Sequence, residues 1–168
     1  NSKRLPGKIF LKVNKKPIIQ HLIERLKKIE KVSKIIIATT RNHKDDIIVN
    51  FAKRLKVDFY RGSEKKVTKR VFYASKKFKI KTIISITSDC PLIDISIINR
   101  CIKLFKKKNV DFLTNAHFRS YPDGMDVQIF KHNALKKALD LAVTKKDFEH
   151  TTYVLRKNPK LFKTFHVF

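Results

Sequence analysis

The sequence is poor in cysteine, glycine and tryptophan, and it has no long apolar segment. Its 168 residues contain two cysteines, three glycines, one methionine and no tryptophan. The two cysteines, Cys90 and Cys101, cannot form the framework of a disulfide-rich domain, and no zinc ligand set is recognisable. No apolar run approaches the ~18 residues that a membrane span needs. These shortages exclude collagen-like, coiled-coil, disulfide-rich secreted and transmembrane proteins.

Acidic residues are also few, which leaves the chain strongly basic. The 40 Lys and Arg residues against 14 Asp and Glu residues give a formal charge of +26. Clustered cations are typical of nucleic-acid-binding proteins, but here the lysines are spread along almost every segment. We therefore interpret most of the charge as a generic basic surface, with a polyanion- or nucleic-acid-binding α/β module as the alternative. Such a surface will still attract anions, including a nucleotide triphosphate.

Hydrophobic residues make up 42% of the chain, enough to exclude disorder and to form a core. Short apolar runs alternate with segments of helical periodicity, which is typical of an α/β layer protein with a largely parallel sheet. Strands are predicted at 34–39, 57–60, 81–87, 110–114, 127–130 and 164–168, and helices at 17–31, 42–56, 63–78, 94–107, 133–143 and 148–157. With no repeat and no Gly/Ser-rich linker, we expect residues 1–168 to form one domain.

The two ends of the sequence resemble interior parts of a fold. The segment 2–8 has the composition of a loop with no element before it, and the segment 164–168 stops within a strand pattern. We therefore expect the domain to be truncated at both ends. The absence of a signal segment and of a disulfide pattern favours a cytoplasmic protein.

Gly7, Gly62 and Gly124 all fall in loops at predicted strand ends, beside charged or hydroxyl residues. In parallel α/β sheets such loops form the ligand crevice, and glycine is required where the backbone takes a positive φ or approaches a ligand closely. In the first loop, Arg4 can bind phosphate oxygens bidentately and Lys8 can place a point charge on them. Gly7 can let backbone amides face the same anion.

Asp89 directly follows a predicted buried strand. A carboxylate at this position can hold Mg²⁺ against substrate phosphates, and a turn or capping role is the alternative. Asp94 is predicted to cap the next helix. Because no histidine stands in an obvious partnering arrangement, we interpret Cys90 as a buried structural thiol rather than a nucleophile.

Two later segments carry further candidate residues. Asp123 and Asp126 flank Gly124 and could contact sugar hydroxyls or a metal, although a plain Asp-Gly turn is nearly as good an explanation. Glu149 and His150 stand near the start of a predicted helix. His150 could orient a substrate hydroxyl, and a surface or capping histidine is the alternative.

Taken in order, these segments resemble the cytidylyltransferases of the spore coat polysaccharide biosynthesis type. These proteins are relatives of the CMP-sialic acid and CMP-Kdo synthetases, within the nucleotide-diphospho-sugar transferase superfamily. The matching segments are SKRLPGK at 2–8, RGSE at 61–64, TSDCPLID at 87–94, PDGMDV at 122–127 and EHTT at 149–152. The resemblance implies a Rossmann-like, GT-A-like three-layer α/β/α fold with a mostly parallel mixed sheet.

The resemblance also implies a reaction, in which CMP passes from CTP to a sugar acid and pyrophosphate is released, in cell-surface polysaccharide biosynthesis. Arg4, Lys8 and Asp89 are the implied catalytic residues, and Asp89 is the implied ligand of Mg²⁺. The implied nucleotide-binding residues are Ser2, Arg4, Gly7, Lys8, Arg61, Gly62, Ser63 and Asp89; the implied acceptor-binding residues are Asp123, Gly124, Asp126 and His150. The implied partners are CTP, a sugar acid and a second copy of the chain. Nucleic acid and membrane are not expected.

The sequence departs from the family pattern at several positions. Lys65, Lys66 and Lys69 stand where the family usually has acidic residues, Ser88 replaces a glycine, and Gln128 replaces an expected acid. These departures leave open a same-fold enzyme that uses another nucleotide, and an inactive homologue. The family also has a strand before the opening loop and a second metal-binding aspartate late in the chain, and we expect both outside residues 1–168.

Overall fold

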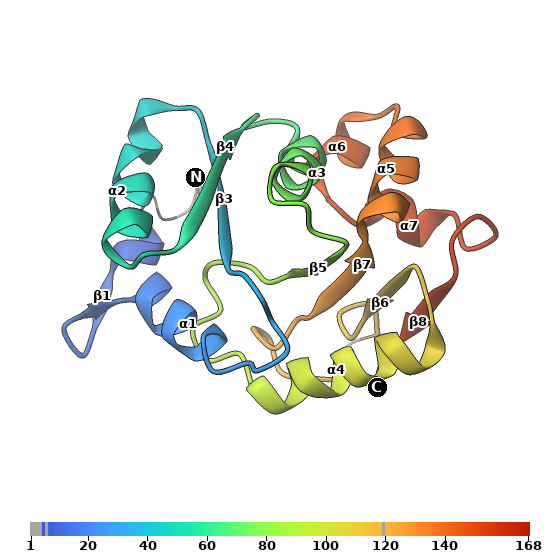
Figure 1. The fold of residues 1–168 in the computed structure, drawn as a ribbon, viewed down its shortest axis with the longest axis horizontal. Coiled ribbons are helices and arrows are strands. Elements are labelled where there is room, and N and C mark those ends of the chain that lie inside the picture. The colour runs from blue at the N-terminus through green and yellow to red at the C-terminus, as the bar shows by residue number, and fades with distance from the viewer. Residues whose placement is uncertain (1–4, 6, 119) are drawn as a thin grey trace.

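The computed structural model describes residue 5 and residues 7–118 and 120–168, and it consists of helices packed around short strands (Figure 1). The strands are β1 (Lys12–Val13), β2 (Lys16–Pro17), β3 (Ile36–Thr40), β4 (Asp58–Gly62), β5 (Thr82–Ser85), β6 (Phe112–Thr114), β7 (Gln128–Lys131) and β8 (Thr164–His166). The helices are α1 (Ile18–Leu26), α2 (Asp46–Arg54), α3 (Val67–Lys77), α4 (Ile95–Lys108), α5 (His132–Asp140), α6 (Lys145–Glu149) and α7 (Tyr153–Lys157), with 3-10 turns η1 (Lys8–Phe10) and η2 (His43–Asp45). The alternation of helices and strands confirms the predicted α/β class.

The strands form two groups besides the small antiparallel β1–β2 hairpin. β3 and β4 pair in parallel, with Thr40 opposite Gly62 at their carboxyl ends. The other four strands lie in the order β5-β7-β6-β8, in which β7 is antiparallel to both neighbours and β8 is parallel to β6. β5, β6 and β8 therefore run in one direction and only β7 is reversed, as expected for a mostly parallel mixed sheet.

The four-stranded sheet is covered on both faces, which explains its continuous apolar sequence. Successive residues of a strand point to opposite faces. Leu113 and Ile129 therefore pack against α4, while Phe112 and Phe130 pack against α5 and α7. Figure 1 shows α4 on one side of these strands and α3, α5 and α7 on the other. This is the three-layer α/β/α arrangement that the resemblance implied.

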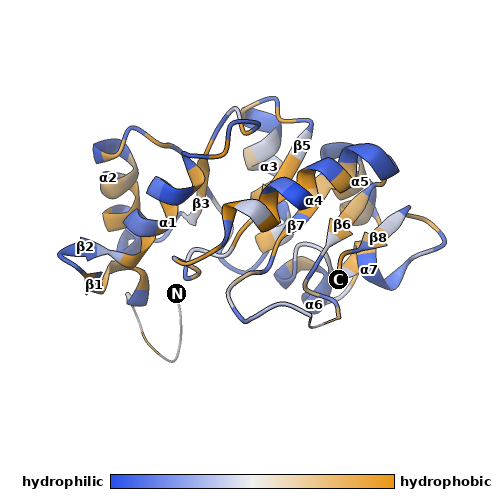
Figure 2. Cartoon of the chain, turned by 90° about the horizontal axis from the view of Figure 1, so that it is seen from below, coloured by the Kyte–Doolittle hydropathy of each residue, from blue (hydrophilic) through white to orange (hydrophobic). Residues whose placement is uncertain are grey.

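The β3–β4 half has a core of its own. Ile19 and Ile23 of α1 pack with Phe51 of α2 and with Val57, and the ring of Phe10 meets that of Phe51 edge-on at 5.5 Å between centroids. In Figure 2 the helices carry both hydrophilic and hydrophobic residues, as amphipathic surface helices do. None of the helices in the described part of the chain combines the length and the apolar character needed to cross a membrane.

Capping side chains mark the starts of α4 and α6, and the start of α6 corrects one prediction. Asp94 accepts a hydrogen bond from the Ser96 amide at 2.7 Å, so it caps α4 as predicted. The single helix predicted at 148–157 is wrong. Thr144 and Asp147 form a capping box that starts α6 at residue 145, and the extended backbone of His150 separates α6 from α7.

Within the described residues the β3–β4 pair and the four-stranded sheet share no ladder, and a cavity of about 1530 Å³ opens between them. Its walls include Ile36 and Ile37 on β3, with Ile83 and Ile84 on β5. The strand expected before the opening loop stays a prediction. The cavity is where the loops after β3, β5 and β6 converge, so it positions the candidate site.

Candidate functional site

Lys8 and Asp89 are 81 residues apart in the sequence, yet their side chains form an ion pair. Lys8 follows Gly7, whose φ of +73° lies in the left-handed region that favours glycine. Asp89 lies in the loop after β5, and about a third of each charged side chain is exposed. The hydrogen bond from Lys8 holds the pKa of Asp89 below its usual range, so the carboxylate stays ionised. The structure thus brings the predicted phosphate-binding cation next to the predicted metal-binding acid.

The turn around Gly124 lies against the loop that carries Asp89. Gly124 has a φ of +89°, and a Cβ added to it would lie 4.0 Å from the Cys90 sulfur. Burial raises the pKa of the Cys90 thiol, and the nearby charges of Asp89 and Asp126 act in the same direction. A thiol that stays protonated supports a structural role for Cys90, since the thiolate is the reactive form. The side chain is half-buried, and not buried as predicted.

Asn115 fixes the backbone that follows this turn. Its side-chain amide donates to the Met125 carbonyl at 2.8 Å, and its Oδ1 accepts from the Val127 amide at 2.7 Å. Asn115 is 2% exposed, so these hydrogen bonds form away from water and are costly to break. The residue follows β6 directly and joins the end of that strand to the segment that carries Asp126.

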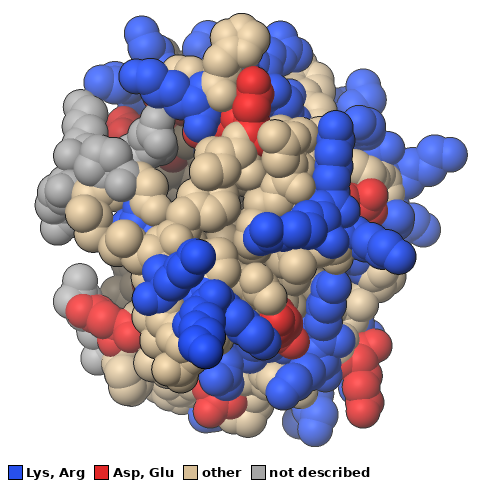
Figure 3. Space-filling model, turned by 90° about the vertical axis from the view of Figure 1, so that its left-hand side faces the viewer, with Lys and Arg blue, Asp and Glu red and all other residues tan. Residues whose placement is uncertain are grey.

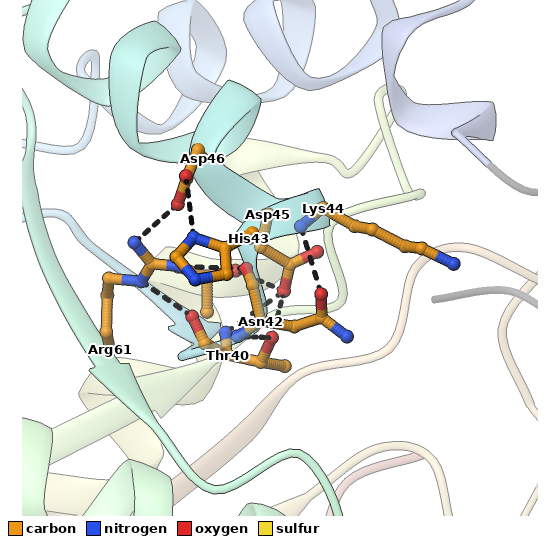
Figure 4. A network of polar contacts seen from close by, with 8 residues as sticks. Thr40, Asn42, His43, Lys44, Asp45, Asp46 and Arg61 are labelled. Atoms are coloured by element: carbon orange, nitrogen blue, oxygen red, sulfur yellow. Dashed lines mark hydrogen bonds and ion pairs between the residues drawn. The ribbon is translucent and has the colours of Figure 1, made fainter.

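Arg61 lies at the end of β4 in a network of polar contacts (Figure 4). Its Nε donates to the Thr40 carbonyl at 2.8 Å, its Nη2 donates to the Asn42 carbonyl at 2.7 Å, and its Nη1 contacts Asp46 at 2.5 Å. Every nitrogen of this guanidinium has a protein acceptor. These contacts fasten the end of β4 to the loop after β3, and the nucleotide-binding role implied for Arg61 stays a prediction.

Asp45 completes the same network from below the surface. It is 5% exposed, and its Oδ2 accepts from the Thr39 hydroxyl at 2.9 Å, the Thr40 amide at 3.1 Å and the Thr40 hydroxyl at 2.5 Å. Burial raises its pKa, but the hydrogen bonds from Thr40 and Thr39 outweigh burial and hold the pKa below its usual range. Asp45 is therefore an ionised buried acid whose Oδ2 accepts three hydrogen bonds.

Gly62 and Ser63 lie against the side chain of Arg70 on α3. A Cβ on Gly62 would come within 2.8 Å of the Arg70 Cγ and 2.9 Å of the Tyr60 ring, so only glycine fits without a shift. The Arg70 Nη1 donates to the Ser63 carbonyl at 2.6 Å, whereas its Nε is buried and has no partner among the described residues. Burial lowers the pKa of this guanidinium. Arg70 holds the 61–64 loop and also lines the cavity.

The segment that carries His150 is anchored on both sides. Asp147 is fully buried and accepts from the amides of Val143 and Thr144 at 2.9 and 2.8 Å and from the Lys157 ammonium at 2.6 Å. The hydrogen bond from Lys157 lowers the pKa of Asp147 far below its usual range, despite the opposing effect of burial. Gln128, one of the departures from the family pattern, accepts a hydrogen bond from Thr152 at 3.1 Å.

The lysines that depart from the family pattern lie beside this segment. The ammonium groups of Lys66 and Lys69 lie 5.2 and 5.4 Å from the centre of the Phe148 ring, within cation–π range. Figure 3 shows Lys and Arg side chains in several separate groups on the face it presents, with acidic and uncharged residues between them. This face carries no single basic patch of the kind typical of nucleic-acid-binding proteins.

The cavity brings some of the predicted residues together. Gly7, Lys8, Asp89 and His150 line it. Gly62 and Ser63 are not among the lining residues, but they contact Arg70, which is. The turn at 122–126 lies against Cys90, next to Asp89 in the sequence. Ser2 and Arg4 lie outside the described residues, so their implied roles stay predictions.

Sequence reasoning missed several residues to which the structure gives a role, and four of them, Asp45, Arg70, His117 and Arg156, line the cavity. The missed residues are Asp45, Arg70, Asn115, His117, Asp147, Arg156 and His166. Only Asp147 had a local signal, because a threonine followed three residues later by an acid is the spacing of a capping box. The other positions depend on contacts between segments that are distant in the sequence.

The position of Asp89 fits a magnesium ion shared with substrate phosphates. Its carboxylate is ionised, partly exposed and beside the cavity. Mg²⁺ in such sites is held by one or two carboxylates together with phosphate oxygens and water. No group of three or more His, Cys, Asp or Glu side chains in the described ranges is arranged to hold a metal. A metal ion at Asp89 would therefore depend on the phosphates of the nucleotide.

Comparison with known proteins gives a consistent family. A family model described as "Cytidylyltransferase" matches residues 1–168. A cytidylyltransferase structure from Leptospira borgpetersenii is 33% identical, with a TM-score of 0.93 over 99% of this chain and 71% of that one. The spore coat polysaccharide biosynthesis protein SpsF of Bacillus subtilis is 24% identical over 96% of this chain and 68% of its own length. The 3-deoxy-manno-octulosonate cytidylyltransferase of Wigglesworthia glossinidia brevipalpis is 32% identical over 83% of this chain and 56% of its own.

Proposed function

The chain belongs to the cytidylyltransferase family, and on that premise we propose that it transfers CMP from CTP to a sugar acid of cell-surface polysaccharide synthesis. The observation that carries this proposal is the contact between Lys8 and Asp89 beside the cavity. A cation for the triphosphate and an acid for its metal ion are the two groups that the reaction needs at one place.

In the proposed reaction a hydroxyl oxygen of the acceptor forms a bond to the α-phosphorus of CTP. The bond from that phosphorus to the bridging oxygen breaks, and pyrophosphate leaves with the electron pair. The O–H bond of the acceptor breaks as well, and its proton is released to solvent. Mg²⁺, when bound, neutralises charge on the phosphates. The chain's own contribution is positioning and charge. Lys8 faces the phosphates, Asp89 is the residue that would hold the ion, and Arg70 keeps the 61–64 loop in place beside the nucleotide.

The relatives indicate the chemical class of the acceptor and not its identity. One relative is named for its action on 3-deoxy-manno-octulosonate, a sugar acid. We extend this class to the present chain because His150 and Arg156 bring imidazole and guanidinium groups to the same cavity. Such groups suit an anionic acceptor.

The test measures pyrophosphate release by the full-length protein with CTP, Mg²⁺ and a panel of 3-deoxy-2-keto sugar acids. We expect release with at least one acceptor and a thermal shift with CTP that exceeds the shifts with UTP, GTP and ATP. The absence of pyrophosphate with every acceptor, together with no thermal shift from CTP, would overturn the proposal. A larger shift with another nucleotide would instead indicate a same-fold enzyme of different base preference.

Asp89→Asn tests the assigned role of the carboxylate. We expect turnover to fall by about 10²-fold or more, because the neutral amide is a far weaker ligand for a divalent cation. Asp58→Asn is the matched control, since Asp58 also pairs with a partly exposed lysine, at 3.2 Å from Lys34. The control should retain turnover, and retained turnover in Asp89→Asn would remove the metal role from Asp89.

A further inference from the structure

The carboxyl ends of β6 and β8 place three nitrogen-bearing side chains side by side. β6 and β8 are parallel, with Thr114 opposite His166, so the residues after each strand meet at one edge of the sheet. The rings of His117 and His166 lie 4.8 Å apart between centroids. Arg156, on α7, brings its Nη1 to 3.5 Å from the His117 Nδ1. In parallel sheets this edge is where ligands bind.

Among the described residues, no carboxylate provides a counter-charge for this cluster. Within the described part of the chain, neither histidine nor Arg156 forms an ion pair with a carboxylate. Other cations of this protein do form such pairs, among them Lys8, Lys16 and Lys157. The Nδ1 atom of His166 is buried and has no hydrogen-bond partner among the described residues. Burial and the neighbouring His117 and Arg156 hold the pKa of His166 below its usual range. An anion bound to Arg156 would supply the counter-charge that the described residues do not provide.

The cluster opens into the cavity that holds the proposed reaction centre. His117 and Arg156 line the same cavity as Lys8 and Asp89. Where Arg156 donates to the His117 Nδ1, the Nε2 of the same ring is the N–H donor, which puts a second donor next to the guanidinium. A planar guanidinium with an adjacent N–H matches the two oxygens of a carboxylate.

We propose that Arg156 and His117 bind the carboxylate of the acceptor and that His166 positions the His117 ring. This inference rests on the proposed function for the identity of the acceptor, but the anion site itself can be tested without turnover. Arg156 and His117 are the groups that contact the carboxylate. His166 acts through His117, because the two rings lie 4.8 Å apart between centroids.

The binding test uses lactate, a small 2-hydroxy acid, as the probe, with NMR detection of the histidine ring nitrogens in the labelled full chain. We expect saturable shifts at His117 and His166 and none at His43, whose side chain is fully exposed on the other half of the molecule. Lactamide has the same shape without the charge and should cause no shift. Arg156→Gln should abolish the lactate response, whereas the control Arg54→Gln, on α2, should not.

Several results would overturn the proposal. The first is that lactate causes no saturable shift of the His117 and His166 ring nitrogens. The second is that lactamide causes the same shift as lactate, and the third is that the shift with lactate persists in Arg156→Gln. Saturation by inorganic phosphate but not by lactate would overturn the carboxylate assignment. In the turnover assay, Arg156→Gln should raise the KM for the acceptor by about tenfold or more while leaving the KM for CTP unchanged. Failure of CTP to bind the wild-type protein would count against the proposed function alone, because the lactate test needs no nucleotide.

Discussion

Arg61 and Arg156 lie in different halves of the molecule, and their surroundings differ in kind. Arg61 gives all three of its guanidinium nitrogens to protein acceptors, and the neighbouring Asp45 accepts three hydrogen bonds. Arg156 has one long contact to His117 and no carboxylate partner among the described residues. Buried polar groups are normally satisfied within the fold, and the network around Arg61 obeys this rule, which indicates scaffolding. Beside the exposed Arg156, the Nδ1 of His166 is buried and has no partner among the described residues, which indicates a place for a ligand.

The half of the molecule that carries Arg156 also contains a satisfied network, which shows that the contrast is local. Asp147 is fully buried, and its carboxylate has amide and ammonium partners. Within the described residues, the lack of a carboxylate at Arg156 and the unpartnered Nδ1 of His166 are therefore local features of that cluster.

The largest expected effect on stability is that of Asp147→Asn. The amide cannot replace a buried carboxylate as acceptor for Lys157 and two backbone amides, and we expect the free energy of unfolding to fall by about 2–3 kcal/mol. Because the folded pKa of Asp147 is depressed, its contribution is present above its unfolded pKa of about 3.9 and is lost as the pH falls further. Urea unfolding near neutral and at acidic pH measures both effects. Equal stability of variant and wild type near neutral pH would contradict the assignment.

Arg61→Ala should destabilise the protein by about 1–2 kcal/mol, because two carbonyls and Asp46 lose their donor. Arg61→Lys should recover little of this loss, since one ammonium cannot reproduce the forked geometry. Urea unfolding of the two variants gives the comparison. Full recovery by lysine would show that charge alone matters at this position.

Arg156→Gln should change the free energy of unfolding by no more than about 0.5 kcal/mol, because the side chain is exposed and makes one weak contact. The same urea measurement applies. A loss comparable to that of Arg61→Ala would break the contrast between the two arginines and make Arg156 a structural residue.

The smallest effect concerns the titration of His166. Its folded pKa lies below the unfolded value of about 6.5, so its neutral form contributes stability above that pH and the contribution falls as the pH drops below it. Arg156→Gln removes one of the neighbouring positive charges and should raise the pKa of His166 toward its usual value. An NMR titration of the ring follows this change. An unchanged titration would show that burial and His117 alone account for the shift.

The sequence was a good guide where a feature depends on neighbours in the chain. The apolar runs predicted the main strands, and Asp94 was correctly predicted to cap α4. The positions of Gly7 and Gly124 were also readable, because their turns require a positive φ that favours glycine. The helix predicted at 148–157 was wrong because helical periodicity hid the capping box at Thr144 and the break at His150.

Features that depend on distant segments could not be predicted in the same way. Arg61 was singled out for its motif, but its three acceptors lie around the loop after β3. Arg70, His117 and Arg156 belong to no recognisable motif, and they become candidates only when α3, β6 and α7 meet around one cavity.

By itself, the sequence determined the α/β class, the family resemblance and the loops that carry Lys8 and Asp89. Periodicity, glycine placement and short motifs are local properties, and a chain shows them without folding. The tertiary structure decided which charges are paired and which are not. It joined Lys8 to Asp89, closed the network around Arg61, and left the cluster of His117, His166 and Arg156 without a carboxylate in the described residues. Pairing depends on distances between strand ends, and only the packed sheet sets those distances.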